Sequence, residues 1–206
     1  MAYDVAEDIK QAYIEVGTSY EVLRKGVQVG SGEYLLYDLN AQVTKPFIRE
    51  HFLEASLPFD TSGEAGDVLR FHNGDCYLLM NKSPFELENK VLEYSTVLYK
   101  ANTSGELRRP SGEAWDTQTY HKTPIFGVIE TNVYSLLTES LFRYELSEQD
   151  FGQLAIAKDE LYIPKVYGIR LNDRYEPKSG EYYRVTTIKT RGFPGVDVVG
   201  VEEDTR

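Results

Sequence analysis

The C-terminal segment Leu171–Arg206 constrains the fold more than any other stretch, because its residues alternate as those of a β-strand do. The two faces of this run carry, respectively, Tyr182, Arg184, Thr186 and Ile188, and Tyr183, Val185, Thr187 and Lys189. Turn residues bound it at Pro177–Gly180 and at Gly192–Gly195. A second run, Val196–Val201, then leads into the last five residues. The segment therefore predicts a β-hairpin.

A similar pattern occurs earlier in the chain, at Gly66–Lys82. Asp67 precedes Gly74 by seven residues, as Asp173 precedes Gly180. Each glycine is followed directly by an acid and, two residues after the acid, by a tyrosine, Tyr77 and Tyr183; a weaker echo begins at Gly32. Two explanations stay open: a duplicated unit, or two ordinary hairpins that share the same turn chemistry.

The rest of the chain predicts a mainly β protein, an antiparallel barrel or sandwich with a short N-terminal helix. The helix is expected over Asp4–Val16, because its apolar residues have helical spacing and Gly17 can end it. Strands are expected at Ser19–Arg24, Glu33–Leu39, Phe47–Leu57, Val91–Tyr99, Ile125–Glu130, Leu154–Ala157 and Ile169–Leu171, with a hairpin over Val68–Asn81. Val133–Tyr144 fits a helix and a strand equally, and Phe47–Leu57 also fits a helical face although we favour a strand.

These elements indicate one β-rich domain over residues 1–206. Within it, residues 1–65 are a candidate for an added N-terminal subdomain. We expect one barrel or sandwich to contain the four clearest strand segments, Val68–Asn81, Val91–Tyr99, Tyr182–Ile188 and Val196–Val201. Residues Thr103–Thr123 have no apolar period, and we expect a long, exposed, mobile loop there. Within this loop, Arg108, Arg109, Trp115 and Lys122 are the candidate contact residues.

Composition narrows the range of functions. The net charge of −11 argues against a protein that holds nucleic acid by neutralising phosphates, although it permits one that lets DNA pass. No apolar run is long enough for a membrane-spanning helix, and no secretory signal is evident, so we expect assembly in the cytoplasm and no membrane partner. The single cysteine, Cys76, rules out an internal disulfide.

Recognisable catalytic chemistry is missing from the sequence. The three histidines, His51, His72 and His121, lack the spacing of metal ligands, and no nucleotide-binding or hydrolase motif occurs. His72 and Cys76 flank a turn, which could suggest a Cys–His nucleophile, but a small buried cysteine beside a turn is the ordinary case. We therefore expect no catalytic, cofactor or metal site.

Several of these segments together resemble the neck proteins of long-tailed bacteriophages. The resemblance is carried by the hairpin GDVLRF…YLLMNK, the strand ENKVLEYSTVLYKAN, the loop SGELRRPS and the closing NDRYEPKSGEYYRVTTIK…VEEDTR. Within that family the chain is most similar to head-closure (stopper) or head–tail joining proteins. The resemblance spans roughly residues 66–206, with GEYLLYDLNAQVTKPF as softer support before it.

The resemblance implies a structural virion protein that forms a homo-oligomeric ring below the portal. Such a ring closes the DNA-filled head and docks the tail; its neighbours are the portal or an adaptor above and a tail-terminator or tail protein below. The mid-chain loop would face the channel and touch packaged DNA transiently. Alternatives are a tail-terminator or other tail-completion protein, a β-rich carbohydrate- or protein-binding module, and a small hydrolase with unrecognised catalytic groups.

Overall fold

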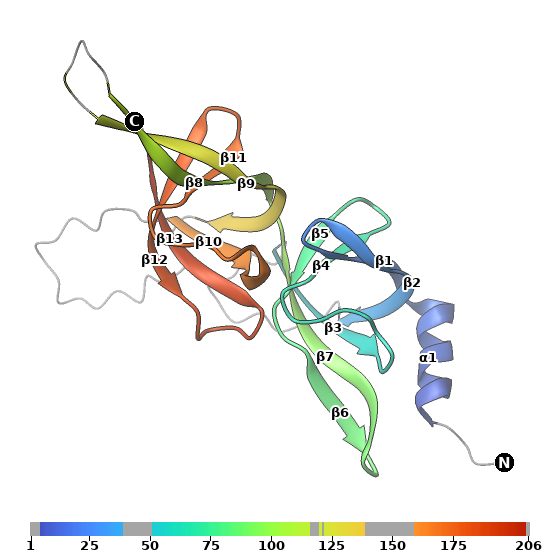
Figure 1. Ribbon diagram of the computed structural model, residues 1–206. Helices are drawn as coiled ribbons and strands as arrows, with labels where there is room; N and C mark the ends of the chain where they lie inside the picture. The colour runs from blue at the N-terminus through green and yellow to red at the C-terminus, as the bar shows by residue number, and fades with distance from the viewer. Residues whose placement is uncertain (1–4, 39–50, 116–119, 121, 139–158, 205–206) are drawn as a thin grey trace, which may run out of the picture.

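The computed structural model describes residues 5–38, 51–115, 120, 122–138 and 159–204, and it is a mainly β protein as the sequence predicts. Two β-barrels lie side by side, and one helix packs against the outer side of the first (Figure 1). The N-terminal barrel and its helix comprise α1 (Val5–Val16), β1 (Thr18–Arg24), β2 (Val27–Asp38), β3 (Phe52–Pro58), β4 (Val68–Phe71), β5 (Cys76–Leu79), β6 (Ser83–Leu87) and β7 (Lys90–Lys100). The C-terminal barrel comprises β8 (Thr103–Trp115), β9 (Lys122–Thr138), β10 (Asp159–Pro164), the 3-10 helix η3 (Lys165–Tyr167), β11 (Arg174–Lys178), β12 (Glu181–Lys189) and β13 (Val196–Glu203).

The two barrels have the same strand order. In the N-terminal barrel the pairings run β1–β2–β3–β7–β5–β4 and return to β1, while β6 is added outside β7. In the C-terminal barrel they run β8–β9–β10–β13–β12–β11 and return to β8. Every neighbour is antiparallel. Each strand of the first barrel except β6 therefore has a counterpart in the second.

The turn that the sequence repeats is built in the same way in both barrels. The Asp67 carboxylate accepts hydrogen bonds from Arg24 (2.8 and 2.7 Å) and from the Glu64 backbone N–H (2.8 Å). The Asp173 carboxylate likewise accepts from Arg109 (2.8 and 2.7 Å) and from the Arg170 N–H (2.8 Å). The residue before each aspartate has a positive φ: Gly66 in one barrel and Asn172 in the other.

These shared details favour a duplicated unit over two unrelated hairpins. The matching residues Pro58, Asp67 and Gly74 have the same spacing as Pro164, Asp173 and Gly180. The weaker echo at Gly32 has another origin. Gly32 has a positive φ at the bulge between β1 and β2, and Asn132 has one at the matching bulge between β8 and β9.

Each barrel has its own apolar interior, and a third cluster joins the two. Inward-facing residues such as Leu57 and Leu69 fill the first barrel, and Leu161 and Val199 are among those that fill the second. The third cluster lies between the outer faces of the barrels and consists of Leu23, Val68, Cys76, Leu78, Met80, Tyr99, Leu136 and Val196, with Tyr162 and Phe193 packed against it. Burial of this much apolar surface holds the barrels together.

A close backbone approach tightens the same contact. A Cβ atom on Gly195 would lie 1.9 Å from the backbone oxygen of Ala65, so only glycine fits there. The loop that carries Gly195 is held by Lys165, whose Nζ donates to the backbone oxygens of Thr190 (2.7 Å), Phe193 (2.6 Å) and Pro194 (3.0 Å). The loop therefore meets the first barrel in a fixed shape.

Helix α1 covers the side of the first barrel formed by β2, β3 and β7. Tyr13 is buried, and its hydroxyl donates to Glu93 on β7 (2.5 Å). Burial, followed by the hydrogen bond to Glu93, raises the pKa of Tyr13, so this hydroxyl remains a donor at neutral pH. The helix ends where Gly17 N–H donates to the Tyr13 carbonyl (2.8 Å), as expected.

Several strand predictions are confirmed. The hairpins β4–β5 and β12–β13 form, and β3 (Phe52–Pro58) overlaps the strand favoured at Phe47–Leu57. For Val133–Tyr144, left open between helix and strand, the described residues through Thr138 are a strand. Leu154–Ala157 lies outside the described residues.

Four expectations are wrong. The four clearest strand segments do not share one barrel but are divided between two. Residues 1–65 are not a separate subdomain, because β1 pairs with β4 and β3 pairs with β7. Ile169–Leu171 is not a strand. Most of Thr103–Thr123 is not a loop: β8 runs to Trp115 and β9 begins at Lys122, whereas 116–119 and 121 are not described. Period-two patterning failed there because both faces of the outer part of this hairpin, from Pro110 to Trp115, are exposed, so nothing selects apolar residues at alternate positions.

Candidate functional site

The long hairpin formed by β8 and β9 is the main feature that extends beyond the barrels (Figure 1). β8 pairs with β11 only through Glu106–Arg108, and β9 pairs with β10 only through Leu136–Thr138. Beyond these points, in the part of the chain that the structure describes, the two strands pair only with each other, out to Trp115 opposite Lys122. We call residues 109–115 and 122–130 the β8–β9 ribbon.

The ribbon exposes large apolar side chains. Trp115 is 57% exposed, Ile125 49% and Val128 50%, and Tyr120 between the strands is 75% exposed. A two-stranded ribbon with both faces in water is marginally stable by itself. Exposed apolar side chains on such an element are typical of a surface that another chain covers.

The structure separates the four residues that the sequence suggested as channel contacts. Trp115 and Lys122 are cross-strand neighbours near the end of the ribbon. Arg108 and Arg109 lie near its base, where Arg109 forms a bidentate pair with the buried Asp173 and also donates to the Gly168 carbonyl (2.9 Å). Arg109 is thus part of the repeated turn. Whether any of the four contacts DNA stays a prediction.

Arg108 belongs to a row of three arginines that the sequence did not reveal. Arg174 is the cross-strand neighbour of Arg108 on one side and of Arg184 on the other. Like charges directly opposite each other are unfavourable unless they are compensated. Only strand register brings these residues together, so neither spacing nor composition could have indicated the row.

Carboxylates compensate each member of this row. Arg108 lies between Glu106 (2.8 Å) and Glu176 (2.5 Å), Arg174 pairs with Asp204 (2.7 Å), and Arg184 pairs with Glu202 (3.3 Å). The Arg174 guanidinium also stacks on the Phe126 ring, 3.8 Å from its centroid. Lys122 on the ribbon pairs with Glu113 (2.8 Å). These cations already have anionic partners, so the surface is poorly suited to binding the phosphate groups of a nucleic acid.

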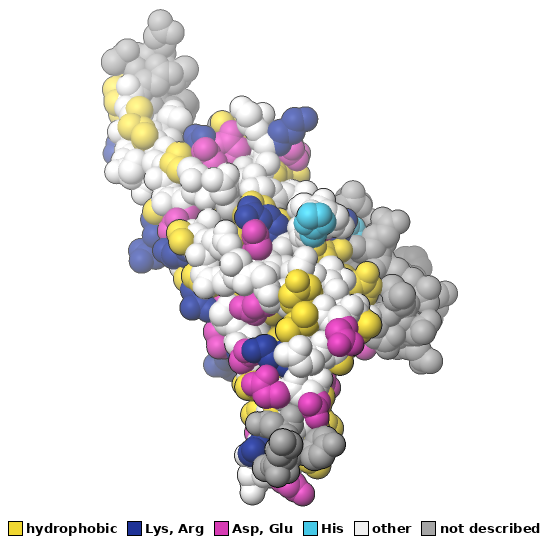
Figure 2. Space-filling model, turned by 90° about the vertical axis from the view of Figure 1, so that its right-hand side faces the viewer, with side chains coloured by type: hydrophobic (Ala, Val, Ile, Leu, Met, Phe, Trp, Pro, Cys, Tyr) yellow, Lys and Arg dark blue, Asp and Glu magenta, His cyan; other side chains and the backbone are white. Residues whose placement is uncertain are grey.

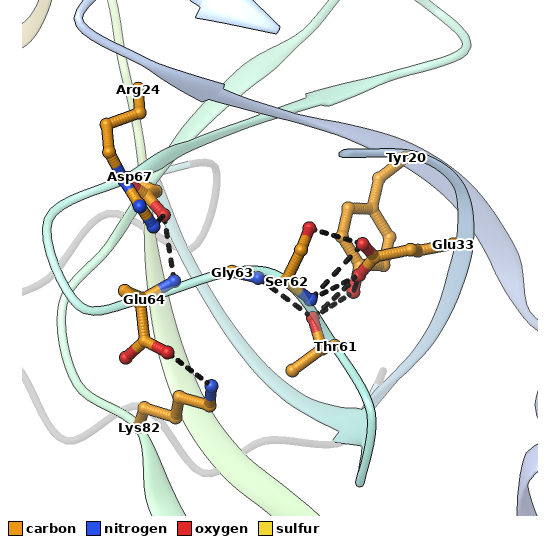
Figure 3. Close-up of polar contacts among 9 residues, drawn as sticks. All are labelled: Tyr20, Arg24, Glu33, Thr61, Ser62, Gly63, Glu64, Asp67 and Lys82. Carbon is orange, nitrogen blue, oxygen red and sulfur yellow. Dashed lines mark hydrogen bonds and ion pairs between the residues drawn. The ribbon is translucent and has the colours of Figure 1, made fainter. Parts of the chain in front are cut away.

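A second polar cluster centres on Glu33 of β2 (Figure 3). Its carboxylate accepts hydrogen bonds from the hydroxyls of Tyr20 (2.8 Å), Thr61 (2.7 Å) and Ser62 (2.5 Å), and from the Ser62 N–H (3.2 Å). Burial raises the pKa of Tyr20, and the Glu33 carboxylate contributes to the increase, so Tyr20 stays protonated. Because Glu33 accepts bonds from several donors at once, it serves to fix the loop after β3 and is not positioned as a general base for Ser62.

Two pockets lie at equivalent places in the two barrels. The first, about 390 Å³, is lined by Ser19, Tyr20, Glu21, Gly32, Arg70, Phe71, His72 and Gly74. The second, about 280 Å³, is lined by Ser104, Gly105, Glu106, Arg108, Thr131, Asn132, Glu176, Pro177, Lys178 and Ser179. Both lie beside the matching bulges, so the shared backbone geometry accounts for them.

The pockets lack an acid–base arrangement. Glu106 and Glu176 face each other across β8 and β11, but the Arg108 guanidinium lies between them and forms an ion pair with each. In the first pocket Glu21 is paired with Arg70. The hydrolase alternative needs a free pair of acids, and neither pocket provides one.

The remaining candidate groups also lack an activating environment. Burial raises the pKa of the Cys76 thiol, which disfavours the reactive thiolate. In the described ranges, no group of three or more His, Cys, Asp or Glu side chains is arranged to hold a metal ion. Within those same ranges, no helix has the length and apolar character to span a bilayer.

Acidic and basic side chains are interspersed on the face of the molecule shown in Figure 2, without a large region of one sign. This view agrees with the ion pairs described above.

Comparison of the chain with protein-family models, with curated proteins and with solved structures found no match. The site must therefore be interpreted from its geometry and chemistry.

Proposed function

We propose that this protein is a structural component of the head-to-tail connector of a long-tailed bacteriophage, where it closes the DNA-filled head and docks the tail. One observation carries the proposal. Two of the segments that carry the sequence resemblance, in 66–82 and 171–189, form the same hairpin at the same place in two equivalent barrels. The resemblance therefore applies to a repeated barrel unit and not to isolated turns.

The electrostatics of the surface support this role. A connector must let DNA pass through its channel without binding it tightly. The chain has a net charge of −11, and the arginines and the lysine expected to contact DNA are paired with carboxylates. Such a surface releases few counterions from DNA and binds it weakly. In this role the β8–β9 ribbon, with exposed Trp115, contacts neighbouring proteins of the connector.

The proposal is tested by conditional loss of this chain in the virus that encodes it. We expect filled heads that lose their DNA and carry no tail, and purified protein added to such heads should restore both properties. Tailed particles that retain DNA in the absence of the chain would contradict the proposal.

A finer test concerns the ribbon. Replacing 111–124 by a short turn keeps every pairing of β8 with β11, so the barrel should fold. We expect the shortened protein to fail to restore tails, because the exposed rings of Trp115 and Tyr120 are removed. A variant with Ile14 on α1 changed to lysine serves as a control with an equally accessible apolar residue elsewhere.

A further inference from the structure

Two open strand edges lie at opposite ends of the molecule. The β8–β9 ribbon projects at one end, and the hairpin of β6 and β7 projects at the other (Figure 1). Among the described strands, β6 is the last of its sheet and pairs only with β7. The unpaired N–H and C=O groups of such an edge are ready to pair with another strand.

Both edges carry exposed apolar side chains. On β6 every residue is exposed, with Phe85 at 55% and Leu87 at 52%. On the ribbon, Ile125 and Val128 are exposed to a similar extent. β6 has no counterpart in the C-terminal barrel, so it is an addition to the repeated unit.

Charge also distinguishes the ribbon from the rest of this acidic chain. Between Pro110 and Ile129 the charged residues that the structure describes are Glu113 and Lys122, and they pair with each other. Two copies with a net charge of −11 repel each other over most of their surface. Contact through an electrically neutral ribbon avoids that repulsion.

We propose that copies of this protein associate head to tail, with the β8–β9 ribbon of one copy against the β6 edge of the next. A two-fold contact between like edges would satisfy one edge of each copy and leave the other open. A head-to-tail contact satisfies both edges, and it generates a ring when the rotation between copies closes. The proposal extends the connector role by naming the surfaces that copies use, but it needs no phage partner.

The β6 edge limits how the contact forms. Pro84 has no N–H to donate, and a bulge lies between Phe85 and Glu86. These features restrict pairing to a short strand in one register. They make unlimited edge-to-edge aggregation unfavourable.

The experiment uses two charged variants of the full chain. One carries Ile125→Lys and Val128→Lys on the ribbon, and the other carries Phe85→Lys and Leu87→Lys on the β6–β7 hairpin. Each should be folded but monomeric in sedimentation velocity, whereas the wild type and the control Ile14→Lys should associate as concentration rises. Circular dichroism establishes that each variant is folded.

Mixing the two variants provides the decisive measurement. Each retains the edge that the other lacks, so a head-to-tail contact predicts that the mixture forms dimers and nothing larger. Monomers in the mixture, or a wild type that stays monomeric throughout, would overturn the proposal. These outcomes concern self-association, whereas the connector role is judged by DNA retention, so the two can fail separately.

Discussion

Replacing Asp173 by asparagine should destabilise the protein by about 3–5 kcal/mol, the range for breaking one side of a buried ion pair. Its side chain is 1% exposed and accepts hydrogen bonds from Arg109 Nε, Arg109 Nη2 and the Arg170 N–H. Asparagine has nearly the same shape but one acceptor oxygen fewer. The change removes a charge-assisted bond of about 1.5–3 kcal/mol and turns an amide donor toward another donor, at a further cost of about 1–3 kcal/mol.

The duplicated turn supplies an internal comparison. Asp67 has the same partners in the first barrel, but its arginine, Arg24, is 41% exposed, compared with 29% for Arg109. Solvent screening should reduce the effect of Asp67→Asn to about 2 kcal/mol. As a control, Asp60→Asn removes a surface pair with the exposed Lys10 and should have the smallest effect of the three.

Equilibrium unfolding in urea, followed by far-ultraviolet circular dichroism, measures all three changes. The expected order of destabilisation is Asp173, then Asp67, then Asp60. If Asp173→Asn cost no more than Asp60→Asn, the repeated turn would not be a structural element of the barrel.

The remaining predictions concern the barrel contact, a buried acid and the cysteine. Gly195→Ala should destabilise the docked barrels, because its Cβ would overlap the facing backbone, whereas Gly192→Ala, with open space around it, should be nearly neutral in thermal unfolding. Burial raises the pKa of Asp197, so the folded state holds its proton more tightly than the unfolded state does. The free energy of unfolding should therefore fall as pH rises from the pKa of Asp197 in the unfolded state, about 4, through its raised pKa in the folded state. Asp197→Asn should remove this pH dependence, which is measured by urea unfolding at several pH values. The same pH dependence in the variant and the wild type would contradict the prediction. Cys76→Ser and His72→Ala should change stability at most and leave the assembly of connectors intact; loss of assembly in a folded variant would contradict this.

Alternation allowed most strands to be predicted from sequence alone. Val91–Tyr99 has one mainly buried face, with Leu92, Thr96 and Leu98, and such a surface selects apolar residues at every second position. In Tyr182–Ile188 the buried residue is Val185, and the strand was predicted because β-branched and aromatic residues dominate it. The repeated aspartate and glycine were also visible, because each turn requires particular residues at a fixed spacing. The ribbon was missed since neither of its faces is buried.

Strand register and the contact between the barrels were decided only by the tertiary structure. Arg108, Arg174 and Arg184 lie far apart in the sequence and become neighbours because β8, β11 and β12 pair. Their counterparts in the first barrel, by matching pairings, are Leu23, Val68 and Leu78, which form part of the apolar cluster between the barrels. The same fold thus has an apolar face where the second barrel covers it and a charged face where water does. A single strand shows which residues share a face, but its sequence does not say what that face will touch, because the partner comes from elsewhere in the chain.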